Sequence, residues 1–268
     1  MRAILLAALL ALGACGQQRA APEAAQSTPP ELTPVRLPQS DAASNRMEAL
    51  TRQGARWCSA DDVWCLDLAE GRPPRVVNGA IARSLPVESD GGVGAWPFLI
   101  RTPDAAPGNG DVYLGLTQRV EQSYSGGGGS ATSVTIYKIT STHRSLRATP
   151  IATLPFSSSI TIRACFSPAD EQRRAGACAD QYRFVSRIRL DEAVTSGPPN
   201  IVLETAAASY PGRVTRGTDS TTRPPLTRAD LVWANDAICS FRRTYSPTAA
   251  GPYAPNIELP ACTDYLEP

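Results

Sequence analysis

The cysteines constrain the fold of this chain more than any other feature. Six of the seven cysteines fall into local couples, namely Cys58 and Cys65, Cys165 and Cys178, and Cys239 and Cys262. Many pairings are formally possible, but this clustering favours three short bridges between the local partners. Loops of this size each contribute about 2.5 to 3.5 kcal/mol by the chain-entropy estimate. Their sum, roughly 9 kcal/mol, is comparable with the net stability of a typical domain, on the order of 5–15 kcal/mol.

A redox or zinc role for these cysteines is the alternative. No couple has CxxC spacing, and His143 is the only histidine of the chain. Structural zinc sites need closely spaced cysteine and histidine ligands. Disulfides are therefore the prediction, provided that the chain is exported, and we expect no metal ion and no cofactor.

The N-terminal residues predict export. Arg2 precedes an apolar segment from Ala3 to Leu12, which is followed by the small residues Gly13 and Ala14. As a helix this segment would reach roughly 15 Å, about half of the roughly 30 Å of a bilayer core. A basic start, a short apolar stretch and small residues are typical of a cleavable secretory signal. We therefore expect residues 1–14 to be absent from the mature protein.

The run Leu12-Gly13-Ala14-Cys15 resembles the signal of bacterial lipoproteins. The resemblance implies that the Cys15 sulfur carries a diacylglyceryl group and that its amino group is acylated, for instance with palmitate. Three acyl chains exceed the two signals that stable anchoring requires. Gly16 stands where lipoproteins of the inner membrane commonly carry Asp, so the resemblance implies the outer membrane, with the ectodomain in the periplasm or exposed at the surface. An ordinary signal peptide with a chance cysteine is the alternative.

The remaining chain divides by composition into a tether and one ectodomain. Residues 15–39 begin with the lipidated cysteine and are rich in Ala, Gln and Pro without apolar periodicity, which predicts disorder. Residues 40–268 are expected to form a single domain. A short helix is predicted at its start, with Asn45 as N-cap, Glu48 completing a capping box and Gly54 as the end.

From Arg56 onward the sequence predicts an all-β fold, because apolar and polar residues alternate and turn formers are frequent. Residues 111–139 are predicted to form a hairpin joined by SYSGGGGSATS. Further strands are expected near 160–166, 182–190, 201–208, 238–245 and 254–259. Such an antiparallel meander could form an irregular propeller, slightly favoured here, or a sandwich or barrel.

Charge excludes one class of partner. The precursor has 26 basic and 25 acidic residues, and removal of Arg2 with the signal leaves 25 of each. Nucleic-acid binding favours clustered Lys and Arg and a strongly basic domain. We therefore expect no nucleic-acid partner.

The sequence supplies few of the residues that catalysis needs. His143 is the only possible histidine base, and no GxSxG motif presents a serine nucleophile. Acidic residues occur at Asp61 and Asp62, at Glu88 and Asp90, and at Asp104 and Asp111 near Asn109, but without a calcium-loop spacing. The glycine run lacks the lysine and the following helix of a phosphate loop. Its residues are instead predicted to form a contact loop at the hairpin tip: Tyr124, Gly126, Gly127, Gly128, Gly129 and Ser130.

These observations favour a non-catalytic β domain that binds an envelope protein or glycan. The blocks YSGGGGSA, RACFSPAD, CSFRRTY and LPACTDY resemble segments of uncharacterised proteobacterial lipoproteins, a likeness that implies no activity. Two alternatives stay open. One is an inhibitor of a lysozyme or protease that uses the loop 123–133, and the other is a periplasmic hydrolase that acts through paired carboxylates.

Overall fold

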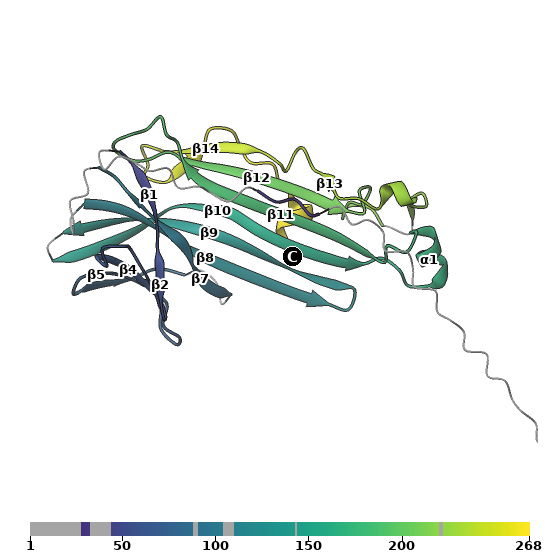
Figure 1. Cartoon of the computed structure of the whole chain (residues 1–268), viewed down its shortest axis with the longest axis horizontal. Helices are drawn as coiled ribbons and strands as arrows, with labels where there is room; N and C mark the ends of the chain where they lie inside the picture. Colours follow the sequence, from purple (N-terminus) through teal and green to yellow (C-terminus); the bar gives the residue numbers. More distant parts are fainter. Residues whose placement is uncertain (1–27, 33–43, 88–90, 104–109, 143, 220–221) are drawn as a thin grey trace, which may run out of the picture.

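The computed structural model describes residues 28–32, 44–87, 91–103, 110–142, 144–219 and 222–268. These residues form two antiparallel sheets, which confirms the all-β prediction (Figure 1). The large sheet contains β1 (Arg46–Ala49), β7 (Gly92–Arg101), β8 (Gly110–Tyr124), β9 (Gly127–Thr142), β10 (Ser145–Arg163), β11 (Ala179–Leu190), β12 (Ile201–Tyr210), β13 (Ala234–Asn235), β14 (Arg242–Pro247) and β15 (Tyr253–Pro255). The small sheet contains β2 (Thr51–Gln53), β3 (Arg56–Cys58), β4 (Trp64–Asp67), β5 (Arg75–Asn78) and β6 (Ile81–Ser84).

The predicted meander is confirmed, because β7 to β12 lie side by side in chain order. β11 and β12 contain the strands expected near 182–190 and 201–208. The strand expected near 160–166 overlaps only the end of β10, at residues 160–163, and those expected near 238–245 and 254–259 overlap β14 and β15 only in part. The described strands do not separate into the four-stranded blades of a propeller, and the large sheet does not close into a barrel. Two short α-helices, α1 (Pro168–Arg173) and α2 (Thr263–Leu266), lie outside the sheets.

The predicted helix near Asn45 is wrong. Residues 46–49 form β1, which pairs with β7 through Arg46 opposite Arg101 and Met47 opposite Ile100. Asn45 caps no helix. Its backbone N–H donates to the Thr195 carbonyl at 2.7 Å, and its side-chain amide donates to the Val194 carbonyl at 2.9 Å. Pairing with a distant strand overrides the local capping pattern, because most of the stability of a short segment comes from its tertiary contacts.

All three predicted disulfides are present. Cys58–Cys65 joins the paired strands β3 and β4, with 4.1 Å between its Cα atoms. Cys165–Cys178 closes the connection between β10 and β11, which contains α1, over 4.8 Å. Cys239–Cys262 spans 5.8 Å and ties the C-terminal segment to the chain that follows β13.

Strand β10 is paired unequally on its two sides. It pairs with β9 from Ser145 to Ile162, but with β11 only from Ser157 onward. Its register with β9 is interrupted at Pro150 and at Pro155, because proline has no N–H to donate and favours a bulge. Beyond these positions the large sheet curves around a core to which both of its halves contribute, with Trp96 and Leu154 on one side and Leu203 and Tyr245 on the other.

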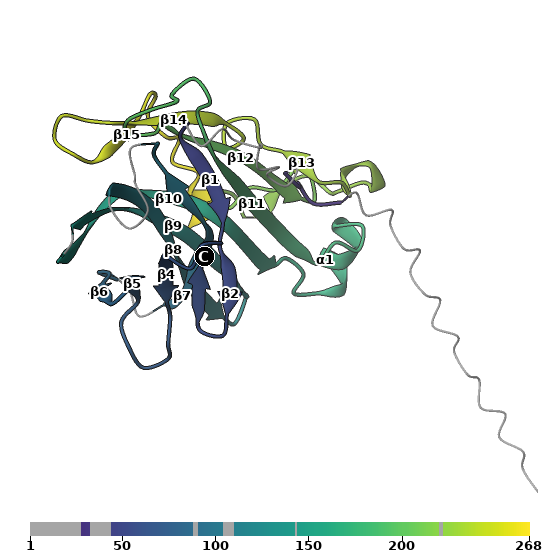
Figure 2. The ribbon, with the colours of Figure 1, turned by 60° about the vertical axis from the view of Figure 1, so that its left-hand side comes forward.

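A second apolar cluster holds the two sheets together. Trp64, Leu66 and Val76 of the small sheet pack against Leu99 and Leu114 of the large one, and all five side chains are buried. Figure 2 shows the small sheet lying beside β7 and β8. Of the predicted architectures, this packing of two sheets comes closest to a sandwich.

A charged group crosses the same junction. The Arg101 side chain on β7 is only 5% exposed, and its guanidinium donates to Glu48 at 3.0 Å and to both oxygens of Asp61 at 2.9 Å. Asp61 belongs to the turn inside the Cys58–Cys65 loop. Burial raises the pKa of Asp61, but hydrogen bonds from the Ser59 hydroxyl and the Val63 N–H, together with Arg101, outweigh burial and lower this pKa overall.

The lowered pKa of Asp61 predicts a pH-dependent contribution to stability. A carboxyl group with a depressed folded-state pKa stabilises the fold above its unfolded pKa, near 4, and loses this effect as the pH falls through the folded value. The free energies of unfolding of the wild type and of Asp61→Asn, measured with urea, should therefore differ at neutral pH and converge as the pH falls below about 4. A difference in free energy of unfolding that stays constant as the pH falls would contradict the lowered pKa of Asp61.

Candidate binding groove

The structure places most of the predicted contact loop inside the sheet. Only Ser125 and Gly126 connect β8 to β9, whereas Gly127 to Ser130 pair with β8 on one side and β10 on the other. The expected loop 123–133 is therefore wrong in extent. Tyr124 ends β8 and is 42% exposed, and its ring lies over Gly126.

The glycine run is required by close packing. A Cβ atom on Gly127 would collide with the Thr161 carbonyl oxygen, and one on Gly128 would lie 2.8 Å from the Gln122 carbonyl oxygen. Both contacts are with backbone that is fixed in the sheet, so neither can be relieved by a side-chain movement. Glycine is the residue that permits such an approach of neighbouring backbones.

A groove runs beside this glycine-rich segment. Its first wall is a row on one face of β8, where Gln118, Val120 and Gln122 point to the same side because alternate residues of a strand share a face. Ala131 and Ser133 lie opposite this row on β9 and form a floor of small side chains. Leu266, Glu267 and Pro268 form the second wall, with Pro155 and Thr132 completing a volume of about 480 Å³.

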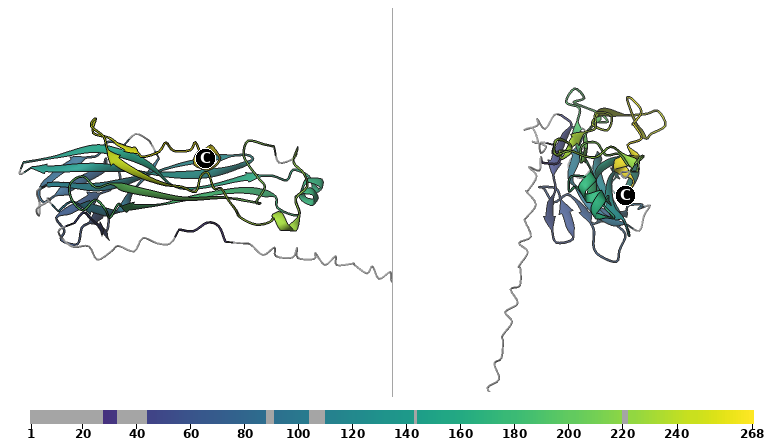
Figure 3. Two further views of the ribbon diagram at one scale, coloured as in Figure 1. Left: turned by 90° about the horizontal axis from the view of Figure 1, so that it is seen from above. Right: turned by 90° about the vertical axis from the view of Figure 1, so that its right-hand side faces the viewer.

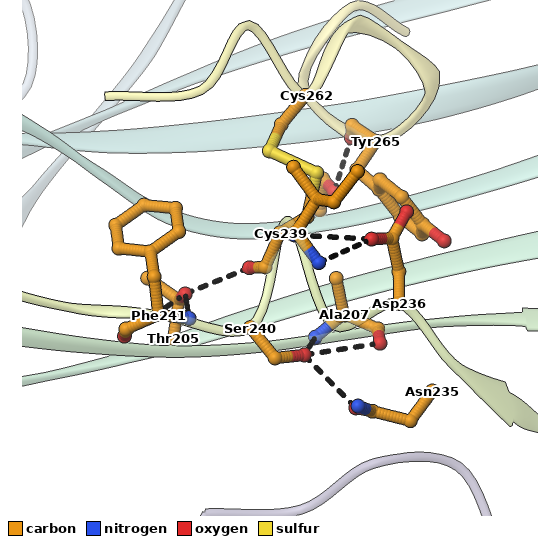
Figure 4. Close-up of a disulfide and its surroundings, with 11 residues drawn as sticks. Thr205, Ala207, Asn235, Asp236, Cys239, Ser240, Phe241, Cys262 and Tyr265 are labelled. Carbon is orange, nitrogen blue, oxygen red and sulfur yellow. Dashed lines mark hydrogen bonds between the residues drawn. A yellow bond between two sulfur atoms is a disulfide. The ribbon is translucent and has the colours of Figure 1, made fainter. Parts of the chain in front are cut away.

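The second wall is held in place by the C-terminal disulfide (Figure 4). Two hydrogen bonds hold the Cys239 end of the bridge near β12. The Thr205 hydroxyl donates to the Cys239 carbonyl at 2.8 Å, and the Asp236 side chain accepts from the Cys239 N–H at 3.1 Å. Cys262 is the residue directly before α2, whose Tyr265 carbonyl accepts a hydrogen bond from Ser158 on β10. The residues that follow thus lie against the sheet at a defined position.

The groove combines three kinds of chemistry. Val120, Ala131, Leu266 and the prolines offer apolar surface, Gln118 and Gln122 offer amide donors and acceptors, and Ser133 offers a hydroxyl. Glu267 is the only ionisable side chain among its lining residues. Such a site favours a neutral ligand that presents both apolar faces and hydrogen-bonding groups.

The other predicted acidic residues occupy structural positions. Asp61 pairs with Arg101, Asp62 accepts a hydrogen bond from Gln53 at 2.9 Å, and Asp111 pairs with Lys138 at 2.6 Å. Four residues considered for ion binding, Glu88, Asp90, Asp104 and Asn109, lie outside the described residues, as does His143.

A hydrolase of this kind needs a carboxyl group with a raised pKa beside a second carboxylate. Within the described ranges only Asp180 has a carboxyl pKa raised by burial, and it forms an ion pair with the buried Arg174 rather than facing a second acid. The same ranges contain no group of three His, Cys, Asp or Glu side chains placed to hold a metal ion.

The groove was missed by the sequence analysis because its walls lie far apart along the chain. The β8 row was predicted as strand but not as a binding surface. The predicted Cys239–Cys262 bridge was the one available signal, since it anchors the C-terminal segment that supplies the second wall.

Cys15 lies outside the described residues, so its acylation stays a prediction. Among the described helices none has the length and apolar character to cross a membrane. No family model, no characterised protein and no solved structure matches the chain. Its function is therefore argued from the groove and the sequence.

Proposed function

We propose that this chain is an outer-membrane-anchored lipoprotein whose β domain binds a neutral glycan of the cell envelope without catalysing a reaction on it. The observation that carries the proposal is the groove, in which two glutamine side chains flank Val120 and face a floor of small residues. Sugar rings have apolar C–H faces and hydroxyl edges, so they match a surface in which apolar and amide groups alternate.

The position of the groove favours a glycan over an extended peptide. A peptide added to a sheet is held mainly by main-chain hydrogen bonds at a free strand edge. The groove instead lies on a sheet face, where β8 and β9 already pair with each other from Gln118 to Tyr124. Recognition must then come from side chains, and amides and hydroxyls are suited to a ligand with many hydroxyl groups.

The lipid anchor in this proposal is supported by the run from Leu12 to Cys15. Its test is metabolic labelling of cells with radioactive palmitate. Wild-type protein should be labelled and recovered with the outer membrane, whereas Cys15→Ser should be unlabelled. Equal labelling of both proteins would contradict lipidation at Cys15.

Glycan binding is tested with purified peptidoglycan sacculi and full-length Cys15→Ser, which stays free of lipid. Co-sedimentation should weaken by about 30-fold in the double variant Gln118→Ala and Gln122→Ala, because two hydrogen bonds contribute about 1 kcal/mol each. Ala131→Trp, which fills the floor, should abolish it. The matched control is Gln172→Ala with Gln181→Ala, two glutamines outside the groove, and it should bind like the wild type.

The same assay distinguishes the alternatives. Release of soluble fragments from the sacculi by the protein alone would indicate a hydrolase. Slower digestion by added lysozyme, without retention on the sacculi, would indicate an inhibitor. Retention that neither the glutamine variant nor Ala131→Trp reduces would overturn the groove as the glycan site.

A further inference from the structure

A row of arginines lies on the face of the large sheet opposite the groove. Arg183, Arg187 and Arg189 occupy odd positions of β11 and therefore point to one side. Glu204 of β12 pairs directly with Arg187, and Arg242 of β14 pairs directly with Glu204, so these two residues share that side. We call these four arginines the arginine face.

Strand register shows that the arginine face and the groove lie on opposite sides. Residues that pair directly on neighbouring strands point to the same side of the sheet. Val120 of β8 pairs with Ala131 of β9, Ala131 pairs with Ser158 of β10, and Ser158 pairs with Phe184 of β11. Phe184 is buried beneath the C-terminal unit and occupies an even position of β11. The arginines at odd positions of the same strand point away from it.

The arginine face has a strong positive charge. Arg187 and Arg189 both donate to Glu204, and Arg242 lies 3.7 Å from the same carboxylate. Burial raises the pKa of Glu204, but the hydrogen bonds from Arg187 and Arg189 outweigh burial and lower this pKa overall. One carboxylate thus stands against four guanidiniums, which gives a net charge of +3.

The guanidiniums of this face are partly accessible. The Nε atoms of Arg183 and Arg189 are buried, but the Arg187 and Arg189 side chains are 23% and 31% exposed. Arg242 is 63% exposed. From Arg183 to Arg189 the row extends about 20 Å at about 3.3 Å per residue. A nearly flat array of guanidiniums is suited to a surface of phosphates, which arginine binds with paired hydrogen bonds.

The chain reaches the same side from its N-terminus. Figure 3 shows the segment 28–32, drawn in dark purple, on one side of the sheet and the C-terminus on the other. This segment leads towards Cys15. A domain that rests on a surface with its arginine face turns the groove away from that surface, because the two lie on opposite sides of the sheet.

We propose that the arginine face rests on the anionic phospholipid headgroups of the membrane that carries the lipid anchor, with the groove turned away from that membrane. The identity of the membrane rests on the lipid anchor proposed above. The binding of anionic headgroups is inferred from the arginines alone. Each basic side chain near an anionic surface strengthens binding by about fivefold, so the four arginines supplement the acyl chains rather than replace them.

The experiment uses residues 15–268 with Cys15→Ser, so that neither acylation nor the apolar segment from Ala3 to Leu12 plays a part. Its binding to vesicles of phosphatidylglycerol mixed equally with phosphatidylethanolamine is measured by sedimentation. Vesicles of phosphatidylcholine serve as the neutral surface. We expect binding to the anionic vesicles only, with a marked decrease as salt rises from about 0.1 M to about 1 M, over which the screening length shrinks from about 10 Å to about 3 Å.

The triple variant Arg183→Gln, Arg189→Gln and Arg242→Gln should bind the anionic vesicles roughly 100-fold more weakly. The matched control changes three exposed arginines elsewhere, Arg52, Arg72 and Arg147, to glutamine with the same loss of charge. It should bind nearly as the wild type does. Urea unfolding of both triple variants identifies any loss of the fold.

Three outcomes would overturn the inference. The first is equal weakening by the two triple variants, which would indicate net charge alone. The second is equal binding to neutral vesicles. The third is evidence that the site takes a free anion. Either of two results would give it: release of the protein from the vesicles by millimolar inorganic phosphate, or binding of soluble polyphosphate by a protein that does not bind the vesicles. Failure of glycan binding would leave these results unchanged, so the two proposals fail separately.

Discussion

Replacing Arg101 by methionine is expected to lower the free energy of unfolding by about 3 kcal/mol. Removing one partner of a buried ion pair costs about 3–5 kcal/mol, because the remaining charge is left without compensation. The loss of stability should lie at the low end of this range, because both carboxylates are partly solvated. The Asp61 side chain is 45% exposed and the Glu48 side chain is 26% exposed. Urea unfolding at neutral pH measures the change.

The matched control for this substitution is Arg119→Met. Arg119 pairs with Glu121 at 2.6 Å, but both side chains are more than half exposed. Exposed pairs contribute about 0–1 kcal/mol, so this variant should unfold within about 1 kcal/mol of the wild type. Equal effects of the two substitutions would show that the buried network does not stabilise the junction between the sheets.

Removing the C-terminal disulfide with Cys239→Ser and Cys262→Ser is expected to lower stability by about 3.5 kcal/mol. The estimate follows from the loop that the bridge closes, which has a sequence separation of 23. The change should also release the second wall of the groove, since α2 directly follows Cys262. Glycan retention should therefore fall more than in the glutamine double variant, even at temperatures where the sheet stays folded.

The matched control for the bridge is the pair Cys58→Ser and Cys65→Ser. This loop has a sequence separation of 7, so its loss should cost about 2.5 kcal/mol, and it lies in the small sheet away from the groove. Both unfolding and sacculus binding are measured. The role assigned to the second wall would be contradicted if glycan binding were weaker in the Cys58 and Cys65 variant than in the Cys239 and Cys262 variant.

Local features of the sequence were sufficient to predict the disulfides and the all-β class. Each cysteine is closer in sequence to its partner than to a cysteine of another couple, and short loops close at a smaller entropic cost. The alternation from Val112 to Val120 likewise predicts a strand without reference to any other strand. It does not predict burial, since Tyr113 on the other face is buried and Val120 is 49% exposed.

The failures share a physical cause, which is dependence on distant partners. Glu48 completes a helical capping pattern in the sequence, yet in the structure it accepts from Arg101, 53 residues away. The arginine face was missed for a related reason. Composition shows balanced charge, whereas the register of β11, β12 and β14 brings three guanidiniums to one carboxylate, that of Glu204. Arg183 lies on the same side of β11.

The two prolines of β10 have a further consequence for the behaviour of the protein at high concentration. Between Ser145 and Phe156 this strand has no β11 partner, so it presents a free edge in the described structure. A free edge can recruit a strand from a neighbouring molecule and start a fibril. Pro150 and Pro155 each remove a hydrogen-bond donor and interrupt the register, which makes this edge a poor template. Molecules held at high concentration can then remain side by side without polymerising.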